Sequence, residues 1–447
     1  MSVSTRGTTP SCGKAACEAA RERRDCRLVD ATAAESPEAA RGVATQRLLV
    51  VNQYYAPDYA ATGQIAAELC ASLADKGMHV RVVAGEPSYT EAALHAPAFE
   101  VLDGVEVHRV GMGGSRGRER LRVRLTGFLR FFFGGWRLAR SLSKSEHPDV
   151  VATFGNPPII SLAVALLARR SRSRFVYILH DIHPDILRAS GFKMLPRPVL
   201  WAFDLVHRWV LKQADFIVVL GDGMKRTLVE RKGVREGRVR VIPLWARPEL
   251  DATPVNSSVR RELGVKDADL LLLYAGNMGV MHPLDDVLDA AVSCRGLKVH
   301  FLLIGDGARR AALVARVEEE GVAQVSFLPY QSESRFAEIM ATSDASLVVL
   351  KPGLEGLAVP SKAYTSMGAG KPLISLMRPE ADVAKMVAED DCGWNVTSAD
   401  GLTELLRGLV GRRDELVRRG RNGRRAYAEK YTRERAVAEY MEVLASG

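Results

Sequence analysis

The chain has 447 residues, of which 47% are hydrophobic and 26% are charged, and its formal net charge is +9. This length exceeds what one hydrophobic core usually serves and predicts two domains of roughly 200 residues each. The longest uncharged apolar run, residues 159–168, falls far short of the roughly 18 residues that indicate a membrane-spanning helix. A helical membrane protein is therefore not expected.

The first 46 residues are rich in Ala, Ser, Arg and Glu and lack the apolar core of a secretory signal. We expect residues 1–46 to form a disordered extension, with an amphipathic transit segment as the alternative. Six cysteines are scattered along the chain without a Cys-x-x-Cys pair. This spacing argues against a zinc ribbon or a disulfide framework and fits a reducing cytoplasm.

A first series of apolar strands alternates with helical stretches and predicts a Rossmann-like domain over residues 47–246. The predicted strands are residues 47–52, 80–84, 105–110, 150–153, 175–179, 216–220 and 239–242. The loop after the first strand ends at Thr62 and Gly63, where a helix begins. We expect backbone N–H groups at this helix start to reach the substrate, and the alternative is a turn that only caps the helix.

A basic, aromatic segment lies between Arg116 and Arg140, with eight arginines and one acid. Arginine beside Trp and Phe is typical of an interfacial helix that contacts anionic lipid head groups. Two alternatives remain: a solvated helix whose aromatic rings pack into the protein's own core, and a nucleic-acid contact. Because no RNA or DNA motif accompanies the charge, we expect no nucleic-acid partner.

His180 and Asp181 directly follow an apolar strand, which places them at its carboxyl edge. We expect them to hydrogen-bond or polarise a ligand, because imidazole stabilises charge that develops at a sugar or a departing phosphate. The His-x-x-His spacing also allows a metal site. However, Pro184 biases His183 toward an extended backbone, so the two imidazoles need not share one face of a helix. A purely structural turn is the third alternative.

A second strand series restarts after a linker at residues 247–258 and predicts another Rossmann-like domain over residues 259–425. Its expected strands are residues 270–274, 299–304, 325–327, 346–350 and 373–376. Residues 426–447 have helical periodicity and are expected to cross back to the first domain. The predicted fold class is α/β, with two facing doubly wound domains whose strand-to-helix loops line the site.

Two glycine-containing loops follow successive strands of this second domain. The first holds Gly276, Asn277, Gly279 and His282, and the second holds Gly305, Asp306 and Gly307. Without side chains, these glycines let the backbone approach a diphosphate closely. The alternative for the second loop is a tight turn in which Asp306 caps the next helix.

A third loop, 359–372, runs from Val359-Pro360-Ser361-Lys362 into a helix and ends in Gly370-Lys371-Pro372. Pro360 suits a helix start, where free N–H groups, the helix dipole, the Ser361 hydroxyl and the Lys362 ammonium converge on an anion. Glu355, just ahead, offers a carboxylate to two adjacent sugar hydroxyls, with an exposed loop acid as the alternative.

Together these motifs resemble the family 4 glycosyltransferases of the GT-B fold over roughly residues 47–445, and within them the bacterial colanic acid and O-antigen fucosamine transferases. The resemblance rests on Tyr-Ala-Pro followed by Thr62-Gly63, His180-Asp181 with Pro184, Gly276-Asn277-x-Gly279, Gly305-Asp306-Gly307, and Pro360-Ser361-Lys362-x-Tyr364 ending in Gly370-Lys371-Pro372. It implies a retaining transfer of a hexosyl or N-acetylhexosaminyl group from a nucleoside diphosphate sugar, which serves as co-substrate without a metal or other cofactor.

The resemblance also implies roles for single residues. His180 falls near the donor sugar, and Glu355 lies close to the family's first donor-sugar glutamate. Thr365 replaces the second glutamate, which commonly grips the nucleotide ribose, and Asn277 and His282 replace the Arg and Lys of the first diphosphate loop. Lys362 is left as the cation for the leaving diphosphate. His180, Glu355 and Lys362 are thus predicted to be catalytic.

The substrate-binding residues predicted with them are Thr62, Gly63, Asp181, Gly276, Asn277, Gly279, His282, Gly305, Asp306, Ser361, Tyr364 and Thr365. The expected enzyme is cytoplasmic and peripheral at the inner face of the plasma membrane, where it extends a lipid-linked glycan in surface polysaccharide biosynthesis. Two alternatives stay open: a nucleotide-sugar epimerase of the same fold, and an inactive nucleotide-sugar-binding or scaffold protein, which Thr365 motivates.

Overall fold

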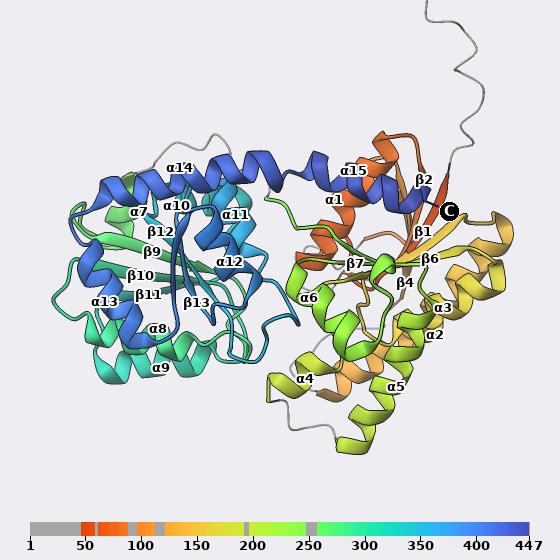
Figure 1. The fold of residues 1–447 in the computed structure, drawn as a ribbon, viewed down its shortest axis with the longest axis horizontal. Coiled ribbons are helices and arrows are strands. Elements are labelled where there is room, and N and C mark those ends of the chain that lie inside the picture. The colour runs from red at the N-terminus through yellow and green to blue at the C-terminus, as the bar shows by residue number, and fades with distance from the viewer. Residues whose placement is uncertain are drawn as a thin grey trace, which may run out of the picture. The chain divides into compact units, whose positions relative to one another are not determined.

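The structure, a computed structural model, describes residues 46–58, 61–87, 96–111, 121–191, 196–246 and 257–446. The predicted N-terminal extension up to residue 45, the first part of the basic segment (116–120) and linker residues 247–256 lie outside these ranges. Within them the strands form two sheets (Figure 1). This confirms the predicted α/β class with two parallel-sheet domains.

The first sheet has eight strands in the order β3-β4-β2-β1-β5-β6-β7-β8. Their bounds are β1 (Arg47–Val51), β2 (His79–Gly85), β3 (Phe99–Leu102), β4 (Val105–Val110), β5 (Val150–Thr153), β6 (Arg174–Leu179), β7 (Phe216–Val219) and β8 (Val239–Val241). All neighbours pair in parallel except β3 and β4. In β1 alternate side chains enter different hydrophobic clusters, Leu49 and Val51 one and Leu48 and Val50 the other, because the sheet is covered on both faces.

Helices follow most strands of this sheet: α1 (Ala61–Asp75), α2 (Leu121–Ser145), α3 (Ile160–Ser171), α4 (Asp185–Ala189), α5 (Arg197–Gln213) and α6 (Asp222–Arg226). A π-helical turn, Thr227–Arg231, and a 3₁₀ turn, Glu236–Arg238, precede β8. Helix α3 packs against both α2 and α5.

The second sheet has six parallel strands in the order β11-β10-β9-β12-β13-β14. They are β9 (Leu270–Ala275), β10 (Val299–Ile304), β11 (Val325–Leu328), β12 (Ala345–Val349), β13 (Leu373–Leu376) and β14 (Gly393–Val396). Its helices are α7 (Ser257–Glu262), α8 (Leu284–Ser293), α9 (Arg310–Glu320), α10 (Glu333–Thr342), α11 (Lys362–Gly368), α12 (Asp382–Glu389) and α13 (Ala399–Leu409). Because its strands are parallel, β9, β10 and β12 end at one edge, where the glycine loops lie.

Two helices close the described chain, α14 (Arg413–Lys430) and α15 (Arg433–Ala445). Helix α14 packs on α11 of the second sheet, whereas α15 packs on α1. Val437, Tyr440 and Leu444 of α15 belong to the hydrophobic cluster that covers β1 and β2. The C-terminal helix is thus part of the core of the first sheet's domain.

Two strands were not predicted from the sequence, β3 and β14. In β3 every second residue is exposed, and Asp103 and Gly104, both with positive φ, turn the chain back into the antiparallel β4. A short, half-exposed edge strand carries too weak a hydrophobic pattern to separate it from a loop. In β14 only Gly393 is buried, and the strand pairs on one side with β13.

Helix α2 tests the alternatives for the basic aromatic segment. Phe131 is fully buried and belongs to the core, so for this ring the alternative of internal packing holds. Phe132 and Trp136 are partly buried, whereas Leu129 and Phe133 are exposed. The aromatic residues of α2 are therefore divided between the core and the surface.

Candidate functional site

The loops after β9 and β10 press against each other. The Gly276 N–H donates to the Ile304 carbonyl (2.9 Å), and the Met278 N–H donates to the Asp306 carbonyl (2.8 Å). Gly276 and Gly305 have φ of 142° and 136°, which side chains rarely tolerate. A Cβ on Gly305 would lie 2.1 Å from the Gly276 carbonyl oxygen. Glycine is therefore required at position 305 both for its backbone angle and for the close approach of the two loops.

The Lys362 ammonium sits at this junction. Its Nζ lies 3.9 Å from the centroid of the Tyr274 ring, and a Cβ on Gly276 would lie 3.3 Å from it. The residue as a whole is partly exposed, but the nitrogen itself is buried and has no hydrogen-bond partner among the described residues. Burial lowers the pKa of Lys362 to about 7. The site thus holds a buried cation that lacks an anion of its own.

His282 and Asn277 border the same place. His282 donates through Nδ1 to the Val349 carbonyl (3.3 Å), and its ring meets the Tyr274 ring edge to face. Burial, together with the nearby charge of Lys362, lowers the pKa of His282 to about 3, so it is neutral at pH 7. The Tyr274 hydroxyl donates to the Asn277 carbonyl (2.7 Å), while the Asn277 side chain is exposed. Gly279 is partly exposed and lies against the Asn277 side chain.

The helix after the Asp306 loop, α9, has no side-chain cap bond at its start, so Asp306 does not take the capping role of the alternative. Its Oδ1 accepts the Gly307 N–H (2.7 Å) within its own turn. The residue is otherwise exposed. Its side chain therefore stabilises its own loop.

The turn that opens α11 differs from the sequence prediction in its N–H groups. The Ala363 and Tyr364 N–H groups already donate to the Pro360 and Ser361 carbonyls, each at 3.2 Å. Helix α11 is also short, seven residues. Fewer free N–H groups face an anion here than expected, because the first turn closes on itself. This makes the Lys362 side chain more important than the helix dipole.

Tyr364, predicted to bind substrate, is buried with its ring edge to face against Tyr431 of the loop between α14 and α15. The Tyr364 ring packs in the core that joins α11 to the C-terminal helices, so we propose no ligand contact for it. Ser361 and Thr365 are partly exposed, and the Ser361 hydroxyl makes no capping bond to the helix.

Glu355 lies in the loop between β12 and α11. Its Oε2 accepts the Gly353 N–H (2.7 Å), and its Oε1 is buried without a hydrogen-bond partner among the described residues. One carboxylate oxygen therefore fixes the loop and the other is left for a ligand. This argues against the alternative of an exposed loop acid.

The His180 loop joins the loop that carries Glu355. The Ile182 N–H donates to the Leu357 carbonyl (2.9 Å), and Asp181 forms an isolated antiparallel bridge with Ala358. Burial lowers the pKa of His180 to about 4 and raises that of Asp181 to about 6. The His180 ring meets Phe154 edge to face, with a centroid distance of 5.5 Å. A neutral imidazole is thus held beside the segment that leads to Lys362.

The three residues predicted to be catalytic share one property. His180 Nε2, Glu355 Oε1 and Lys362 Nζ are all buried side-chain atoms without a hydrogen-bond partner in the described structure. Buried polar atoms are nearly always satisfied in folded proteins, so such a group needs an explanation. We take these three atoms as the candidate site, because a bound polar ligand would complete their hydrogen bonds.

Other buried atoms without a partner in the described structure were not predicted, among them Arg310 Nε and Asp382 Oδ2. Arg310 begins α9 directly after the Gly305 loop, and Asp382 begins α12. Burial raises the pKa of Asp382, although the Gly223 N–H donates to its Oδ1 (2.9 Å) and opposes this. Neither residue belongs to a motif, and only their burial in the folded chain distinguishes them.

Thr62 and Gly63 lie in the first turn of α1. A Cβ on Gly63 would lie 3.0 Å from the Tyr54 carbonyl carbon and 3.1 Å from the Tyr55 nitrogen, so the glycine lets the loop after β1 fold closely over the helix start. Thr62 is partly exposed. The neighbours of Gly63 are thus residues of the loop after β1.

An ion-pair cluster that the sequence did not indicate lies next to the His180 loop. Lys232 is buried and pairs with Asp204 (2.5 Å) and with Asp185, the first residue of α4. Burial opposes the ionisation of Asp204, but hydrogen bonds from Arg208 and Lys232 outweigh it and hold its pKa below the usual range. His207, one turn along α5, is buried and its pKa falls to about 3 through burial. The cluster ties α4 and α5 to the turn before β8.

In the described ranges, no group of three or more His, Cys, Asp or Glu side chains is placed to hold a metal. His183 stacks on Phe203 with a centroid distance of 6.1 Å, whereas the His180 ring meets Phe154. The two histidines of the His-x-x-His motif therefore have separate aromatic partners.

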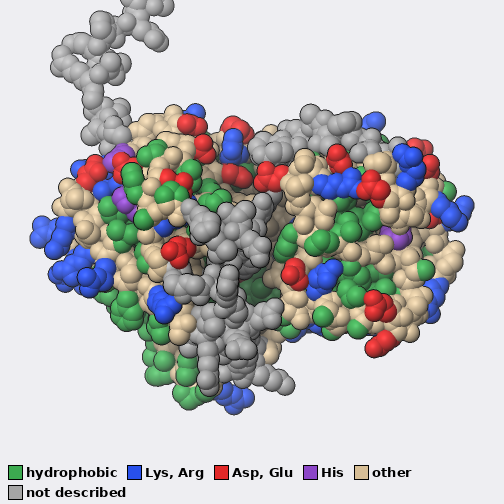
Figure 2. Space-filling view, turned by 180° about the vertical axis from the view of Figure 1, so that it is seen from behind, with side chains coloured by type: hydrophobic (Ala, Val, Ile, Leu, Met, Phe, Trp, Pro, Cys, Tyr) green, Lys and Arg blue, Asp and Glu red, His purple; other side chains and the backbone are tan. Residues whose placement is uncertain are grey.

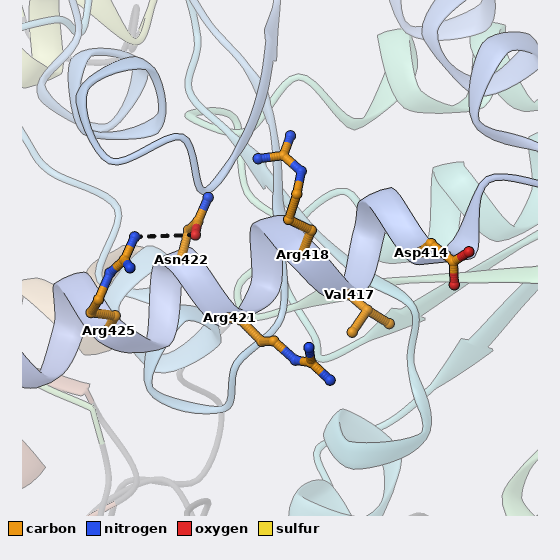
Figure 3. A pocket seen from close by; sticks show the side chains of 6 residues that line it. All are labelled: Asp414, Val417, Arg418, Arg421, Asn422 and Arg425. Carbon is orange, nitrogen blue, oxygen red and sulfur yellow. Dashed lines mark hydrogen bonds between the residues drawn. The ribbon is translucent and has the colours of Figure 1, made fainter.

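A hollow of about 420 Å³ lies on α14 (Figure 3), lined by Asp414, Val417, Arg418, Arg421, Asn422 and Arg425. Arg418 is already paired with Asp391 (2.5 Å), and Arg425 donates to Asn422 (3.3 Å). The hollow contains none of the residues predicted from the sequence, and its lining comes from one helix. We therefore place the candidate site at the strand ends, where buried polar atoms lack partners.

Comparison with known families decides the class of protein. A model described as "Glycosyl transferase 4-like domain" matches residues 61–245, and one described as "Glycosyl transferases group 1" matches residues 256–426. The chain belongs to the family 4 glycosyltransferases of the GT-B fold. The resemblance stated from the sequence is thereby confirmed.

The relatives of this glycosyltransferase include two bacterial proteins that are themselves named as glycosyltransferases. It is 29% identical to "Probable glycosyltransferase WbjE" of Pseudomonas aeruginosa over 58% of this chain and 64% of that protein, a little under two thirds of the relative's length. It is 25% identical to "Putative colanic acid biosynthesis glycosyl transferase WcaI" of Escherichia coli K12 over 72% of this chain and 81% of that one. The crystal structure of Anabaena HepE with UDP-glucose has a TM-score of 0.65 at 15% identity, covering 90% and 99% of the two chains, which shows the shared fold.

The close packing of the two glycine loops leads to a first testable prediction about stability and binding. Replacing Gly305→Ala in this glycosyltransferase forces a Cβ against the Gly276 carbonyl at a φ of 136°, and backbone strain of this kind costs about 1–3 kcal/mol. We expect a lower free energy of unfolding and weaker binding of a nucleoside diphosphate, measured by urea denaturation and calorimetry. Gly408→Ala in α13 is the control, because a Cβ there meets nothing within 4 Å. Equal behaviour of the two variants would contradict the role of the loops.

Proposed function

We propose that this protein transfers a hexosyl or N-acetylhexosaminyl group, with retention of anomeric configuration, from a nucleoside diphosphate sugar to a lipid-linked glycan. The observation that carries the proposal is the buried Lys362 ammonium, which has no anion among the described residues and lies beside the Gly276 loop. A diphosphate supplies the missing negative charge. The solved complex of HepE with UDP-glucose supports a nucleotide sugar as the donor.

In the proposed reaction the bond between the anomeric carbon and the diphosphate oxygen breaks, and the acceptor hydroxyl forms the new bond from the same face of the sugar. The proton of that hydroxyl passes to the departing phosphate oxygen. Lys362 stabilises the charge that grows on the diphosphate as it leaves. The donor needs no metal in this scheme, because a protein cation and backbone N–H groups meet its charge.

His180 and Glu355 are proposed to orient the sugar. With a pKa of about 4, His180 is neutral at pH 7 and donates or accepts a hydrogen bond through its free Nε2. Glu355 keeps one oxygen for sugar hydroxyls, while the other stays bound to its own loop. Holding the donor in one orientation lowers the entropic part of the barrier.

The proposed location is the cytoplasmic face of the plasma membrane, with the segment between Arg116 and Arg140 near the lipid carrier. None of the helices in the described ranges has the length and hydropathy of a membrane span. The exposed Phe133 and Leu129 of α2, with Arg137 on the same helix, support contact with the membrane surface. The name of WcaI, a colanic acid biosynthesis transferase, supports an envelope glycan as the acceptor.

A screen of nucleoside diphosphate sugars by thermal shift tests the donor, because a ligand that binds only the folded state raises the melting temperature. The stabilising donor is then incubated with lipid-linked acceptors, and the anomeric configuration of the product is read by NMR. We expect transfer with retention. Donor turnover without an acceptor would instead indicate an epimerase, and binding without turnover over the acceptor panel would indicate an inactive binding protein.

A further inference from the structure

Exposed apolar side chains are concentrated on three neighbouring helices. Of the thirteen large hydrophobic residues that are exposed in the described part of the chain, eight lie on α2, α3 and α5 or at the cap of α3. They are Leu129, Phe133, Ile159, Leu166, Val199, Trp201, Leu205 and Val206. Scattered exposed apolar residues are normal, but a group of this kind marks an interaction surface.

The three helices share one inner side. Phe131 of α2, Leu167 of α3 and Val210 of α5 all belong to the same hydrophobic cluster under the sheet. Since α3 packs against both α2 and α5, the exposed residues lie on the other side of a continuous helical layer. In Figure 2 hydrophobic side chains gather at the lower left of the molecule, below basic side chains on the left edge.

Helix α5 contributes the most apolar part of this layer. Trp201 is 62% exposed and Leu205 is 47% exposed, one turn apart, and Val199 and Val206 flank them. The one acid of this helix, Asp204, is already paired with Lys232 and Arg208. The first half of α5 therefore presents a surface with a large tryptophan and almost no polar group that water would solvate.

The positive charge of α2, α3 and α5 indicates which kind of partner would bind this surface. By sequence, α2, α3 and α5 carry eleven Lys or Arg residues and one acid. Such a field attracts anionic lipid and repels a second copy of the same surface. Tryptophan and leucine beside arginine match the boundary between head groups and acyl chains.

We propose that α5, together with α2 and α3, forms a docking surface for an anionic bilayer, with Trp201 and Leu205 inserted at the acyl boundary. This deepens the proposed function, because it names α5 rather than α2 alone as the element that enters the lipid. The inference depends on the proposed function only for the biological role of docking, which is to bring the enzyme to a lipid-linked acceptor. Vesicle binding is measured without donor or acceptor.

The test uses the full-length protein and vesicles of phosphatidylcholine with or without 30% phosphatidylglycerol, a composition of about one anionic lipid in three chosen to resemble a negatively charged leaflet. We expect sedimentation with the anionic vesicles, weaker binding at high salt, and loss of binding by about tenfold or more in the Trp201→Ser, Leu205→Ser double variant. Val417→Ser on α14, a residue 50% exposed, is the matched control and is expected to bind like the parent protein.

A second measurement tests whether Trp201 itself enters the bilayer and whether the double variant stays folded. Brominated lipids quench tryptophan fluorescence at the acyl boundary, so the quenching expected in the parent protein should fall when Trp201 is replaced by Ser. The double variant should keep its melting temperature and its thermal shift with the donor. Unchanged vesicle binding of the double variant overturns the proposal, as does a dimer that only the parent protein forms in sedimentation equilibrium. Loss of transfer with normal vesicle binding would concern the proposed function alone.

Discussion

Replacing Lys362→Met is expected to lower kcat by about a hundredfold to a thousandfold, the usual cost of removing one donor that stabilises charge in a transition state. The methionine keeps most of the side-chain volume over the Tyr274 ring and removes only the ammonium. The fold should remain intact, because a buried cation without a hydrogen-bond partner contributes little to stability in the free protein. Transfer rates and urea denaturation of the same preparation check both statements.

Lys371 provides a matched control in the same segment. Its ammonium donates to the Ala341 and Ser343 carbonyls at 2.7 and 2.9 Å, so it is a structural lysine. Lys371→Met should therefore lower the free energy of unfolding and leave kcat of the folded fraction nearly unchanged. A Lys362→Met protein that is folded and transfers sugar at the parent rate would refute the leaving-group role.

The pKa of Lys362 gives this prediction a second readout. With a pKa of about 7, much of the ammonium is deprotonated at pH 8 in the free protein. A bound diphosphate favours the charged form and raises that pKa, so binding must take up a proton. Calorimetry in buffers of different ionisation enthalpy should show uptake approaching one proton at pH 8. The uptake through Lys362 should vanish at pH 5.5, where the lysine is already charged, and should be absent at pH 8 in the Lys362→Met variant.

The largest loss of stability is expected from Lys232→Met. The side chain is 1% exposed and pairs with Asp185 and Asp204, so its removal leaves Asp185 without this cation and Asp204 with Arg208 alone. Removing one partner of a buried ion pair typically costs about 3–5 kcal/mol. Urea denaturation at pH 7 measures this. The exposed pair of Lys225 and Glu236 is the control, since Glu236 is 70% exposed and Lys225→Met should cost less than about 1 kcal/mol.

The pH dependence of that loss has a defined sign. In the parent protein the pKa of Asp204 lies below its usual range, so its contribution is present at neutral pH and is lost only as pH falls through that lowered pKa. In the variant the partly buried Asp204 keeps only Arg208 as a cationic partner and becomes easier to protonate. The difference in unfolding free energy between the two proteins should therefore be larger at pH 7 than at pH 5. A difference independent of pH would mean that packing, not charge, explains the loss.

Several features of the fold could be predicted from the sequence because they depend on local patterns. Strands such as β1, β9 and β12 are nearly continuous apolar runs, and burial on both faces of a parallel sheet favours that pattern. The glycine loops after β9 and β10 are also readable, because few residues other than glycine tolerate a φ near 140°. The same reasoning failed for β3, whose half-exposed, alternating residues resemble a loop.

The site could be predicted in part. His180 was predicted from its place at a strand end, and Lys362 from its place at a helix start with Glu355 just ahead of it. Each has a buried atom without a partner among the described residues. The role of Tyr364 could not be judged, because its contact with Tyr431 joins residues 67 positions apart. Lys232 was missed for a similar reason, since a lysine between arginine and glycine resembles a surface turn until its two aspartates are in place.

The sequence by itself determined the class of fold and the position of the loops, and it singled out Lys362 as the candidate cation, since periodicity, glycine and proline act within a few residues of where they occur. Only the tertiary structure decided which of these groups meet: the His180 loop beside Leu357, Lys362 over Tyr274, and the helices that leave Trp201 exposed. The physical reason is that burial removes water from a charged group, and burial depends on segments far apart in the chain.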